Sequence, residues 1–302
     1  MDLLVVGDAN VDLVLRGGDI VPAFGQREQL VDHAELVLGG SGGIMAAGAA
    51  RLGLDVAIVA CVGDDALGRV TLDALRAAGV AVDGVITDPE AATGVTVALA
   101  RPDDRAILTA PGALARLRAE DVPDELLAAA RHVHVTSPFL QAGLRPGLGA
   151  LAGRARSSSL DTGWDPREAW DVPVAAFDVL FPNAEEALRL AGRGDGDVEA
   201  AARDLAARGP LVVAKLGAQG ALAVHGDDLV RVAAPRVDAV DATGAGDSFD
   251  AGFLAAYLAA GHEDRDGLEA ALRLACACGA LSTREAGGTA AQPTLAEARA
   301  LA

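Results

Sequence analysis

The stretch Val240-Asp241-Ala242-Thr243-Gly244-Ala245-Gly246-Asp247-Ser248-Phe249 places a glycine-rich turn and a carboxylate at the start of an apolar helical pattern. Residues that favour turns and helix N-caps fill its first half, and residues 249–258 continue with the spacing of a buried helix. Amides at such a helix start lack intrahelical acceptors, and the positive end of the helix dipole favours an anion such as a terminal phosphate. Gly244 and Gly246 let that anion approach the backbone closely because they have no Cβ.

Asp247 is the unexpected member of this stretch, since a carboxylate beside an anion site is electrostatically unfavourable unless it takes part in the chemistry. Its natural role there is to accept the proton of a hydroxyl group that attacks phosphorus. Glycine-rich, acidic helix starts also occur as caps that bind nothing. The stretch by itself therefore leaves a phosphate site and a plain cap as open interpretations.

Composition limits the class of protein. A chain of 302 residues, 51% of them apolar, can fill a large core, so we expect it to fold without disulfides or structural metal. The formal net charge of −18 argues against a nucleic-acid or anionic-membrane partner, because both attract Lys and Arg patches. Lys215 is the only lysine and is followed by Leu216, which excludes a P-loop. Phosphate binding must then depend on helix dipoles, arginines and metal ions.

The cysteines and the N-terminus favour a cytoplasmic location. Cys61, Cys276 and Cys278 are odd in number and suggest no paired framework, so we expect buried, inert thiols. From Met1 the chain runs directly into a strand pattern, without the basic start of a signal peptide. No stretch is long and apolar enough to suggest a membrane span.

Short β-branched runs alternate with Ala- and Leu-rich helical patterns, which predicts an α/β fold with a mainly parallel sheet covered by helices. The expected strands are 3–7, 55–62, 132–136, 178–181 and 211–216, and the expected helices are 44–52, 66–78, 145–155, 183–190, 198–207, 246–260 and 268–283. Two extended stretches, 29–38 and the pair 93–100 with 105–109, break the alternation and can pair into a small sheet of their own.

Two polar clusters are expected near the carboxyl edge of this sheet. Gly7-Asp8-Ala9-Asn10-Val11-Asp12 follows the first strand, and open α/β folds bind ligands at that edge, so Asn10 and Asp12 are candidate contacts. An Asx turn without function is the alternative. Gly39-Gly40-Ser41-Gly42-Gly43 precedes an Ala-rich helix, where small residues also serve close packing on the sheet.

Later motifs are open to structural explanations as well. Asn183 and Glu186 have the spacing of a capping box at a helix start, and Lys215 to Gly220 reads as a glycine hairpin. His132 and His134 share one strand face, as a metal pair would, but no third ligand can be nominated, so a structural role is the preferred interpretation. Asp161 follows a serine-rich run and is a further candidate for the cleft.

The order of these motifs resembles that of the ribokinase-like (PfkB) carbohydrate kinases over essentially the whole chain. The stretch 241–247 is similar to the C-terminal signature of that family, and 39–53 is similar to its N-terminal signature. The resemblance implies one kinase domain over 1–302, with a three-layer α/β/α fold, a mainly parallel central sheet and a small β-lid formed by roughly 12–38 and 91–110. It also implies a homodimer contact through the lid.

The resemblance further implies roles for individual residues. Asp247 is the catalytic base, and the amides of Gly244, Ala245 and Gly246 form an anion hole for the transferred phosphoryl group. The remaining implied sites are substrate contacts at Asn10, Asp12, Gly39, Gly40 and Ser41, nucleotide contacts at Asn183, Lys215, Gly217, Gly220 and Thr243, and Mg²⁺ held through water by Asn183 and Glu186.

The implied activity is the ATP-dependent transfer of the γ-phosphoryl group to a hydroxyl of a sugar or sugar derivative. ATP, Mg²⁺ and, by analogy, a monovalent cation are the expected cofactors, and a small sugar-like molecule is the expected partner. Ile44 stands where the family usually has Asn; this removes two donors and an acceptor and favours a less hydroxylated or differently oriented substrate. The sequence names neither the sugar nor its reacting hydroxyl.

Two alternatives stay open. A nucleoside kinase of the same fold is disfavoured by the aromatic content of 3%, because base stacking usually uses rings. A non-catalytic sugar or nucleotide sensor is disfavoured by the intact Asp247, Asn183 and Glu186, since a sensor needs no base.

Overall fold

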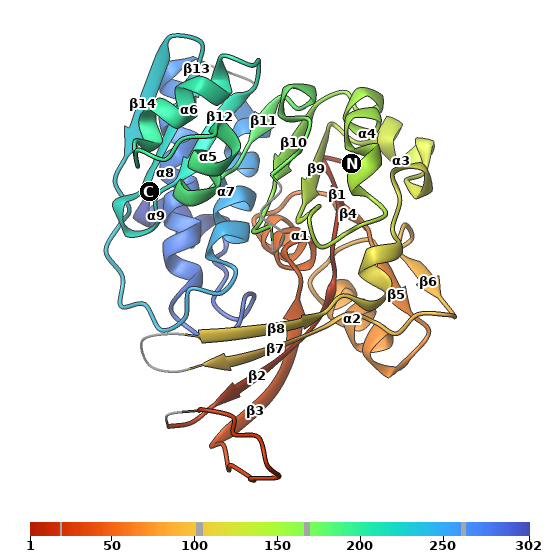
Figure 1. The fold of residues 1–302 in the computed structure, drawn as a ribbon. Helices are drawn as coiled ribbons and strands as arrows, with labels where there is room; N and C mark the ends of the chain where they lie inside the picture. Colours follow the sequence, from red (N-terminus) through yellow and green to blue (C-terminus); the bar gives the residue numbers. More distant parts are fainter. Residues whose placement is uncertain (19, 101–104, 166–169, 261–263) are drawn as a thin grey trace.

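An eight-stranded sheet forms the centre of the protein in the computed structural model, which describes residues 1–18, 20–100, 105–165, 170–260 and 264–302 (Figure 1). Six neighbouring strands run parallel, and β13 and β14 extend the sheet with antiparallel pairs. The carboxyl ends of the parallel strands therefore share one edge. The spatial order is β14 (Asp228–Val232), β13 (Ala221–His225), β12 (Leu211–Lys215), β11 (Val179–Leu180), β10 (Ser158–Asp161), β9 (His132–Thr136), β1 (Leu3–Val6) and β4 (Val56–Val59).

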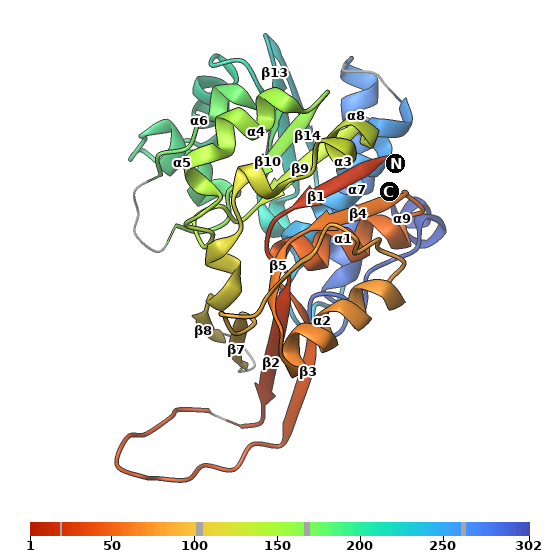
Figure 2. The same cartoon turned by 90° about the vertical axis from the view of Figure 1, so that its right-hand side faces the viewer.

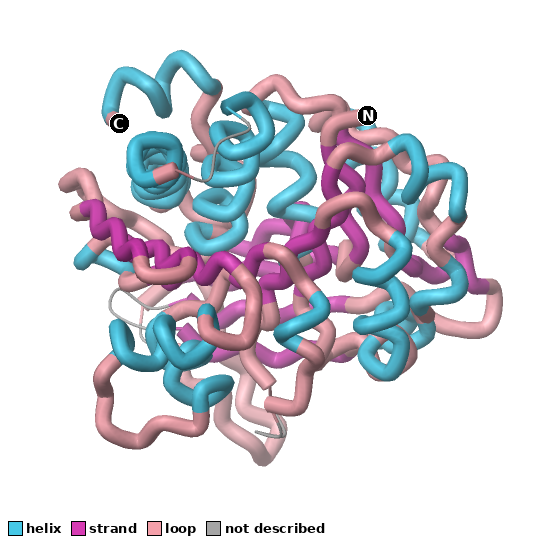
Figure 3. Tube along the Cα trace, turned by 90° about the horizontal axis from the view of Figure 1, so that it is seen from above, coloured by secondary structure: helices cyan, strands magenta, loops and turns pink. Residues whose placement is uncertain are grey.

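Helices cover both faces of this sheet, as the view from above shows (Figure 3). Successive residues of β1 alternate between the two cores: Leu3 and Val5 pack on one face, and Leu4 and Val6 on the other. Because both faces are buried, the strands are short, almost wholly apolar runs. One face carries α1 (Ser41–Arg51), α2 (Ala66–Ala77), α7 (Ala245–Ala260), α8 (Arg265–Ser282) and α9 (Leu295–Leu301), and the other carries α3 (Asp124–Ala129), α4 (Leu148–Arg154), α5 (Ala184–Ala191) and α6 (Val198–Ala206).

A second sheet of four strands projects from the carboxyl edge of the main sheet (Figures 1 and 2). Its strand order is β3 (His33–Gly39), β2 (Asn10–Arg16), β7 (Val95–Ala100) and β8 (Arg105–Ala110), and we call it the lid sheet. β2 pairs antiparallel with β3 and parallel with β7, which pairs antiparallel with β8. Since β2 follows β1 after three residues, the lid sheet is tied directly to the strand that lies next to the edge strand β4 of the main sheet.

Smaller elements complete the described chain. β5 (Cys61–Gly63) and β6 (Ile86–Asp88) form a parallel pair. Among the described residues, no helix combines the length and the apolar character that crossing a membrane requires. The 3₁₀ helices are Gly112–Arg116, Ala119–Asp121, Arg145–Gly147, Val174–Ala176 and Gly217–Gln219.

The predicted fold class is confirmed, including the small second sheet. The expected strand at 132–136 is β9, whereas the expected strand at 55–62 is divided between β4 and β5. The helix expected at 145–155 begins with a 3₁₀ turn and becomes α4 only at Leu148. Strands β2, β6, β10, β13 and β14 and helices α3 and α9 were not predicted. The three cysteines are free and buried, as expected.

Packing between α7 and the sheet gives a direct test of this fold. Phe253 of α7 is fully buried and meets Phe181 edge to face, with ring centroids 5.4 Å apart. We expect Phe253→Ala to lower the free energy of unfolding by about 3–5 kcal/mol, because sheet and helices enclose the cavity that it leaves. Phe24→Ala, at a fully exposed position, is the matched control and should change that free energy by less than about 0.5 kcal/mol. Urea unfolding followed by circular dichroism measures both, and equal effects of the two variants would contradict the packing.

Candidate active site

The loop 240–244 ahead of α7 is held in place by Asp241. One oxygen of its carboxylate accepts hydrogen bonds from the Thr243 amide (2.8 Å) and hydroxyl (2.6 Å), and the other accepts one from the Gly287 amide (2.9 Å). The Asp241 amide donates to the Thr283 carbonyl at the end of α8 (3.0 Å). The loop is thus fixed to the end of α8 before α7 begins.

Gly244 turns the chain into α7 and leaves the first amides of that helix open. Its φ of 70° lies in the left-handed region that favours glycine. The first regular helical bond runs from the Ser248 amide to the Gly244 carbonyl (2.9 Å), and the Ala245 amide makes a longer turn bond of 3.3 Å. Within the described part of the chain, the amides of Gly246 and Asp247 meet no acceptor. We call residues 244–247 the α7 mouth, since its open amides lie at the positive end of the helix dipole.

The start of α1 is the other glycine-led helix start, and a carboxylate of the protein already occupies it. Asp8, buried just after β1, accepts hydrogen bonds from the amides of Ser41 and Gly42 (3.1 Å each) and from the Thr136 hydroxyl (3.1 Å). A helix start filled in this way cannot also hold a phosphate. Of these two helix starts, only the α7 mouth is open. Sequence analysis did not nominate Asp8, although its place after the first strand was an available signal.

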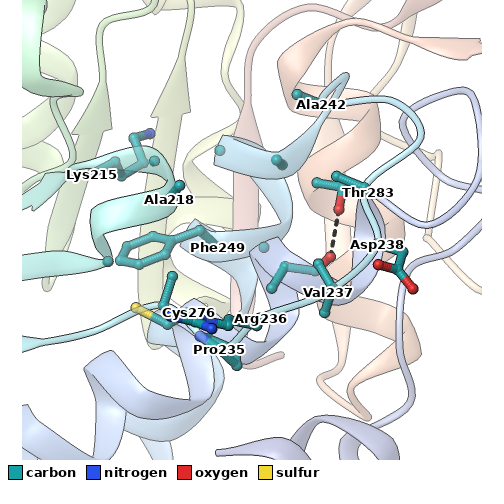
Figure 4. Close-up of a pocket in the computed structure, with 18 residues that line it drawn as sticks. Lys215, Ala218, Pro235, Arg236, Val237, Asp238, Ala242, Phe249, Cys276 and Thr283 are labelled. Atoms are coloured by element: carbon teal, nitrogen blue, oxygen red, sulfur yellow. Dashed lines mark hydrogen bonds between the residues drawn. The ribbon is translucent and has the colours of Figure 1, made fainter.

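A cavity of about 720 Å³ lies beside the α7 mouth (Figure 4). Its volume falls within the usual range for small-ligand sites. Lys215, Gly217 and Gly220, which were predicted to contact the nucleotide, line this cavity together with Gly246 of the α7 mouth. The cavity therefore joins the predicted nucleotide residues to the open helix start.

Much of the cavity wall was not anticipated. The segment 234–239, which follows β14, lines the cavity, and Phe249 and Cys276 add apolar surface from α7 and α8 (Figure 4). No local motif marks these residues, and only the tertiary fold brings them together.

Thr243 was also predicted to contact the nucleotide, but it does not line the cavity. Its hydroxyl is held by Asp241 and also contacts the guanidinium of Arg105, the first residue of β8. Arg105 lies 3.4 Å from the same Asp241 carboxylate. The lid sheet therefore reaches the loop before α7 through an arginine that sequence analysis did not single out.

Asp247 lies in the first turn of α7, and its pKa is raised to about 8. Burial is the main cause of this shift, and the charge of Asp161 adds to it. The charge of Lys215 lowers the pKa, Asp8 raises it, and the hydroxyl of Ser41 lowers it again. A carboxyl group that titrates near neutral pH is well matched to general-base catalysis.

Lys215 lies between two buried carboxylates. Its Nζ is 2.8 Å from Asp161 Oδ2 and 3.1 Å from Asp250 Oδ2. Burial alone would lower the pKa of Lys215, but the charges of Asp161 and Asp250 outweigh it and raise the pKa above its usual value. The lysine therefore stays charged. Asp161, a candidate for the cleft, is a partner of Lys215 but does not line the cavity, and Asp250 was not predicted as a site residue.

Asn10 and Asp12 lie together against the double glycine between β3 and α1. The Asn10 side-chain amide donates to Asp12 Oδ1 (3.0 Å). A Cβ on Gly39 would come within 2.0 Å of that oxygen, and one on Gly40 within 2.7 Å of Asn10 Oδ1. Both glycines are therefore needed for the polar pair to fit. Burial raises the pKa of Asp12 to about 6, which leaves it mainly ionised at neutral pH.

Ile44, the departure from the family pattern, supports the α7 mouth. A Cβ on Gly244 would meet its side chain at 2.9 Å, and one on Gly288 would meet it at 2.4 Å. Its carbonyl accepts a hydrogen bond from Gln292 (2.9 Å), whose amide also donates to the Ser248 hydroxyl (3.1 Å). The isoleucine therefore packs against the glycine loops.

Asn183 and Glu186 form the capping box at the start of α5. The backbone amide of Asn183 donates to Glu186 Oε2 (2.8 Å), and the backbone amide of Glu186 donates to Asn183 Oδ1 (3.0 Å). The side-chain amide of Asn183 also donates a hydrogen bond to Glu186 Oε1 (2.7 Å). The pKa of the buried Glu186 is raised to about 7, mainly by burial and then by Asp161. Among the described residues, no group of three or more His, Cys, Asp or Glu side chains could hold a metal ion directly. A metal at this pair would depend on water and on ligand oxygens.

The two histidines of β9 have structural partners. His132 bonds to the hydroxyls of Ser157 (2.9 Å) and Ser159 (2.7 Å), and His134 bonds to Ser159 (2.7 Å). Burial lowers the pKa of His132 to about 3 and that of His134 to about 4, so both are neutral. The structural interpretation of this pair is confirmed.

Comparison with known proteins adds independent information. A family model described as pfkB family carbohydrate kinase matches residues 1–295. The ATP-dependent ribose-1-phosphate kinase of Halopiger xanaduensis is 32% identical, over 96% of this chain and 94% of that protein. The nucleoside kinase of Methanothermobacter thermautotrophicus is 28% identical, over 85% of this chain and 82% of that protein.

A solved structure has the same fold. An Escherichia coli protein described as a ribokinase II, in complex with ATP and Mg²⁺, superposes with a TM-score of 0.85. The alignment covers 99% of this chain and 98% of that one at 23% identity, and this likeness concerns the fold alone.

Two glycines of the α7 mouth allow a matched pair of substitutions. A Cβ on Gly246 would lie 3.5 Å from Lys215 Nζ, an ordinary contact, so Gly246→Ala should preserve stability to within about 1 kcal/mol. The methyl group would project into the cavity, and we expect ATP affinity measured by calorimetry to fall about tenfold or more. Gly244→Ala should lower the free energy of unfolding by about 1–3 kcal/mol, because φ is positive there and the Cβ would meet Gly288. Unchanged ATP affinity in a folded Gly246→Ala protein would place the ligand elsewhere.

Proposed function

The chain belongs to the pfkB family of carbohydrate kinases and is an ATP-dependent phosphotransferase with an alcohol group as acceptor; from this premise we propose that its acceptor is a hydroxyl of a sugar or sugar derivative. The observation that best supports the proposal is that the open amides of the α7 mouth lie next to the carboxyl group of Asp247. An anion held by the mouth would lie next to a carboxyl group that titrates near neutral pH. That juxtaposition supports attack of a hydroxyl group on phosphorus.

Asp247 is the proposed general base. The acceptor oxygen forms a bond to the γ-phosphorus, the bond from that phosphorus to the β–γ bridging oxygen breaks, and ADP leaves. The proton of the acceptor hydroxyl passes to Asp247. The amides of Gly244, Ala245 and Gly246 would stabilise the charge on the transferred group, and because the loop holds them in place beforehand, little reorganisation is needed.

The nucleotide is proposed to bind in the cavity beside the α7 mouth. Phe249, Cys276 and the segment 234–239 offer an apolar wall for the base, and Gly217 and Gly220 allow the backbone to approach closely. Lys215 lines the cavity and is proposed to lie near the phosphates; Asn183 does not line the cavity but pairs with Lys215 through the backbone, and it is proposed to contact the nucleotide from there. Thr243 would act indirectly, by holding the loop before α7.

The proposed cofactor Mg²⁺ would be held through water by Asn183 and Glu186. Amide and carboxylate oxygens suit this ion, and the lack of a three-residue cluster among the described residues fits an ion that keeps much of its water shell. When bound, Mg²⁺ would neutralise phosphate charge. A monovalent cation is proposed as a further activator by analogy with the family.

The acceptor is proposed to bind between the lid sheet and the α7 mouth, at Asn10, Asp12, Gly39, Gly40 and Ser41. The ionised Asp12 and the Asn10 amide would pair with acceptor hydroxyls. Ile44 contributes no hydrogen bond through its side chain, which supports a sparsely hydroxylated acceptor.

A nucleoside is the second candidate acceptor, and one observation favours it. Phe139, Trp170 and Trp164 form an edge-to-face row with centroid separations of 5.4 Å, on loops after β9 and β10. Trp164 is half exposed, so its ring is available to a base despite the low aromatic content of the chain.

We also propose a homodimer through the lid sheet in a cytoplasmic protein. Leu36, Ile107 and Leu108 are between 51% and 64% exposed on strands of that sheet, and β8 is an edge strand.

Leu108→Glu should convert the dimer to a monomer in light scattering after gel filtration, because it would bury a charge at the contact. Val70→Glu on α2 is the matched control. A wild-type monomer, or equal behaviour of both variants, would refute the lid contact.

A panel of sugars, sugar phosphates, sugar acids and nucleosides with Mg-ATP, scored by ADP release, tests the function.

With the preferred acceptor, Asp247→Asn should lower turnover by about 10²-fold or more and leave ATP binding nearly intact. Because the base must be ionised, the wild-type rate should rise with pH through about 8, the pKa of Asp247. Asp73→Asn on the exposed face of α2 is the control. Unchanged turnover in Asp247→Asn would remove the base assignment.

A further inference from the structure

Lys215 is the only lysine of the chain, and it lies beside the site rather than on the surface. Its side chain is 12% exposed and ends between Asp161, 9% exposed, and Asp250, which is fully buried. The two carboxylates come from different elements, β10 and α7. The ammonium group therefore joins the main sheet to the helix that carries Asp247.

The charges within this trio are balanced. Burial alone would raise the pKa of Asp161, but the charge of Lys215 and a hydrogen bond with Asp250 outweigh it and hold the pKa below its usual value. Burial raises the pKa of Asp250 well above its usual value, against the charge of Lys215, which lowers it. The ammonium group between the two acids leaves neither of them without a positive partner.

The trio also adjoins the reacting groups. Asp250 follows Asp247 by three residues on α7, a spacing that puts both on one side of the helix. A Cβ on Gly246 would meet Lys215 Nζ at 3.5 Å, so the ammonium packs directly against the backbone of the α7 mouth. The fixed positive charge therefore lies next to both the base and the open amides.

Lysine suits this position better than arginine. An ammonium is a compact charge with three donors that can diverge toward Asp161, Asp250 and the cavity, whereas a guanidinium is planar and larger. The chain uses arginine for all its other basic side chains, so the single lysine marks a place where that geometry matters.

We propose that Lys215, fixed by Asp161 and Asp250, is a positioning residue that keeps one positive charge beside Asp247 and the α7 mouth, and that it acts on the chemical step more than on nucleotide affinity. This inference rests on the proposed role of Asp247. The charged and polar groups that interact with Asp247 are Asp161 from β10, Lys215 from β12, Asp8 after β1, Ser41 from α1 and Asp250 from α7 itself.

The test compares Lys215→Met, Lys215→Arg and Lys215→Met/Asp161→Asn with the wild type, using the acceptor that is active in the panel. Lys215→Met should lower kcat by about 10²-fold, with a much smaller change in the KM for Mg-ATP. The rise of kcat with pH that reports the ionisation of Asp247, which we call the acid limb, should move to higher pH in Lys215→Met. The reason is that this variant lacks the positive charge that favours ionised Asp247. Lys215→Arg should restore the position of that limb, and only part of kcat.

The double variant separates electrostatics from folding. It removes the cation together with Asp161, whose charge raises the pKa of Asp247, so the two losses oppose each other and the acid limb should return toward the wild-type pH. Arg203→Met, which removes one exposed cation from α6, is the matched control and should change neither kcat nor the limb.

Three outcomes would overturn the proposal: a raised KM for Mg-ATP at unchanged kcat in Lys215→Met, a lowered kcat with an unmoved acid limb, or a double variant that behaves like Lys215→Met. If Lys215→Met does not fold, the acid limb of Lys215→Arg tests the proposal instead. A limb displaced from the wild-type pH in Lys215→Arg would also overturn the proposal. A fully active Asp247→Asn protein would instead remove the proposed base, which distinguishes that failure from this one.

Discussion

The proposed site depends on one feature at the start of α7: among the described residues, the amides of Gly246 and Asp247 meet no protein acceptor. Most helix starts are capped by a side chain or by water. The start of α1 shows the ordinary solution, because the Asp8 carboxylate accepts hydrogen bonds from its first amides. At α7 the preceding carboxylate, Asp241, is turned back onto its own loop. The amides are therefore left for a ligand, and a phosphate would satisfy them.

A second consequence is the concentration of acids around this opening. Asp8, Asp12, Asp161, Asp247 and Asp250 are gathered at the carboxyl edge of the main sheet, in a chain that already carries a net charge of −18. Helix amides bind Asp8, and the ammonium group of Lys215 lies against Asp161 and Asp250. Asp247 has the least support and titrates near neutral pH, and that is the property a base requires. Local amides and one lysine, rather than overall charge, make the site suitable for a phosphate.

Much of this could be predicted, because the relevant signals are local. The glycine–carboxylate stretch at 241–247 and the alternation of strand and helix patterns identified the fold and the α7 mouth. β10 was missed because its serines hide the strand pattern; one of them, Ser159, is buried and hydrogen-bonds to both His132 and His134. Asp250 and the segment 234–239 could not be found, since their roles depend on contacts with residues distant in sequence. Ile44 was marked as a departure from the family pattern, but its contact with Gly244 and Gly288 needed the tertiary structure.

The most direct test of the account is a crystal structure with ADP, Mg²⁺, fluoroaluminate and an active acceptor. The account predicts the fluoroaluminate within hydrogen-bonding distance of the amides of the α7 mouth, with the Asp247 carboxylate facing the acceptor hydroxyl. A fluoroaluminate bound away from α7, or an Asp247 side chain turned from the acceptor, would contradict it.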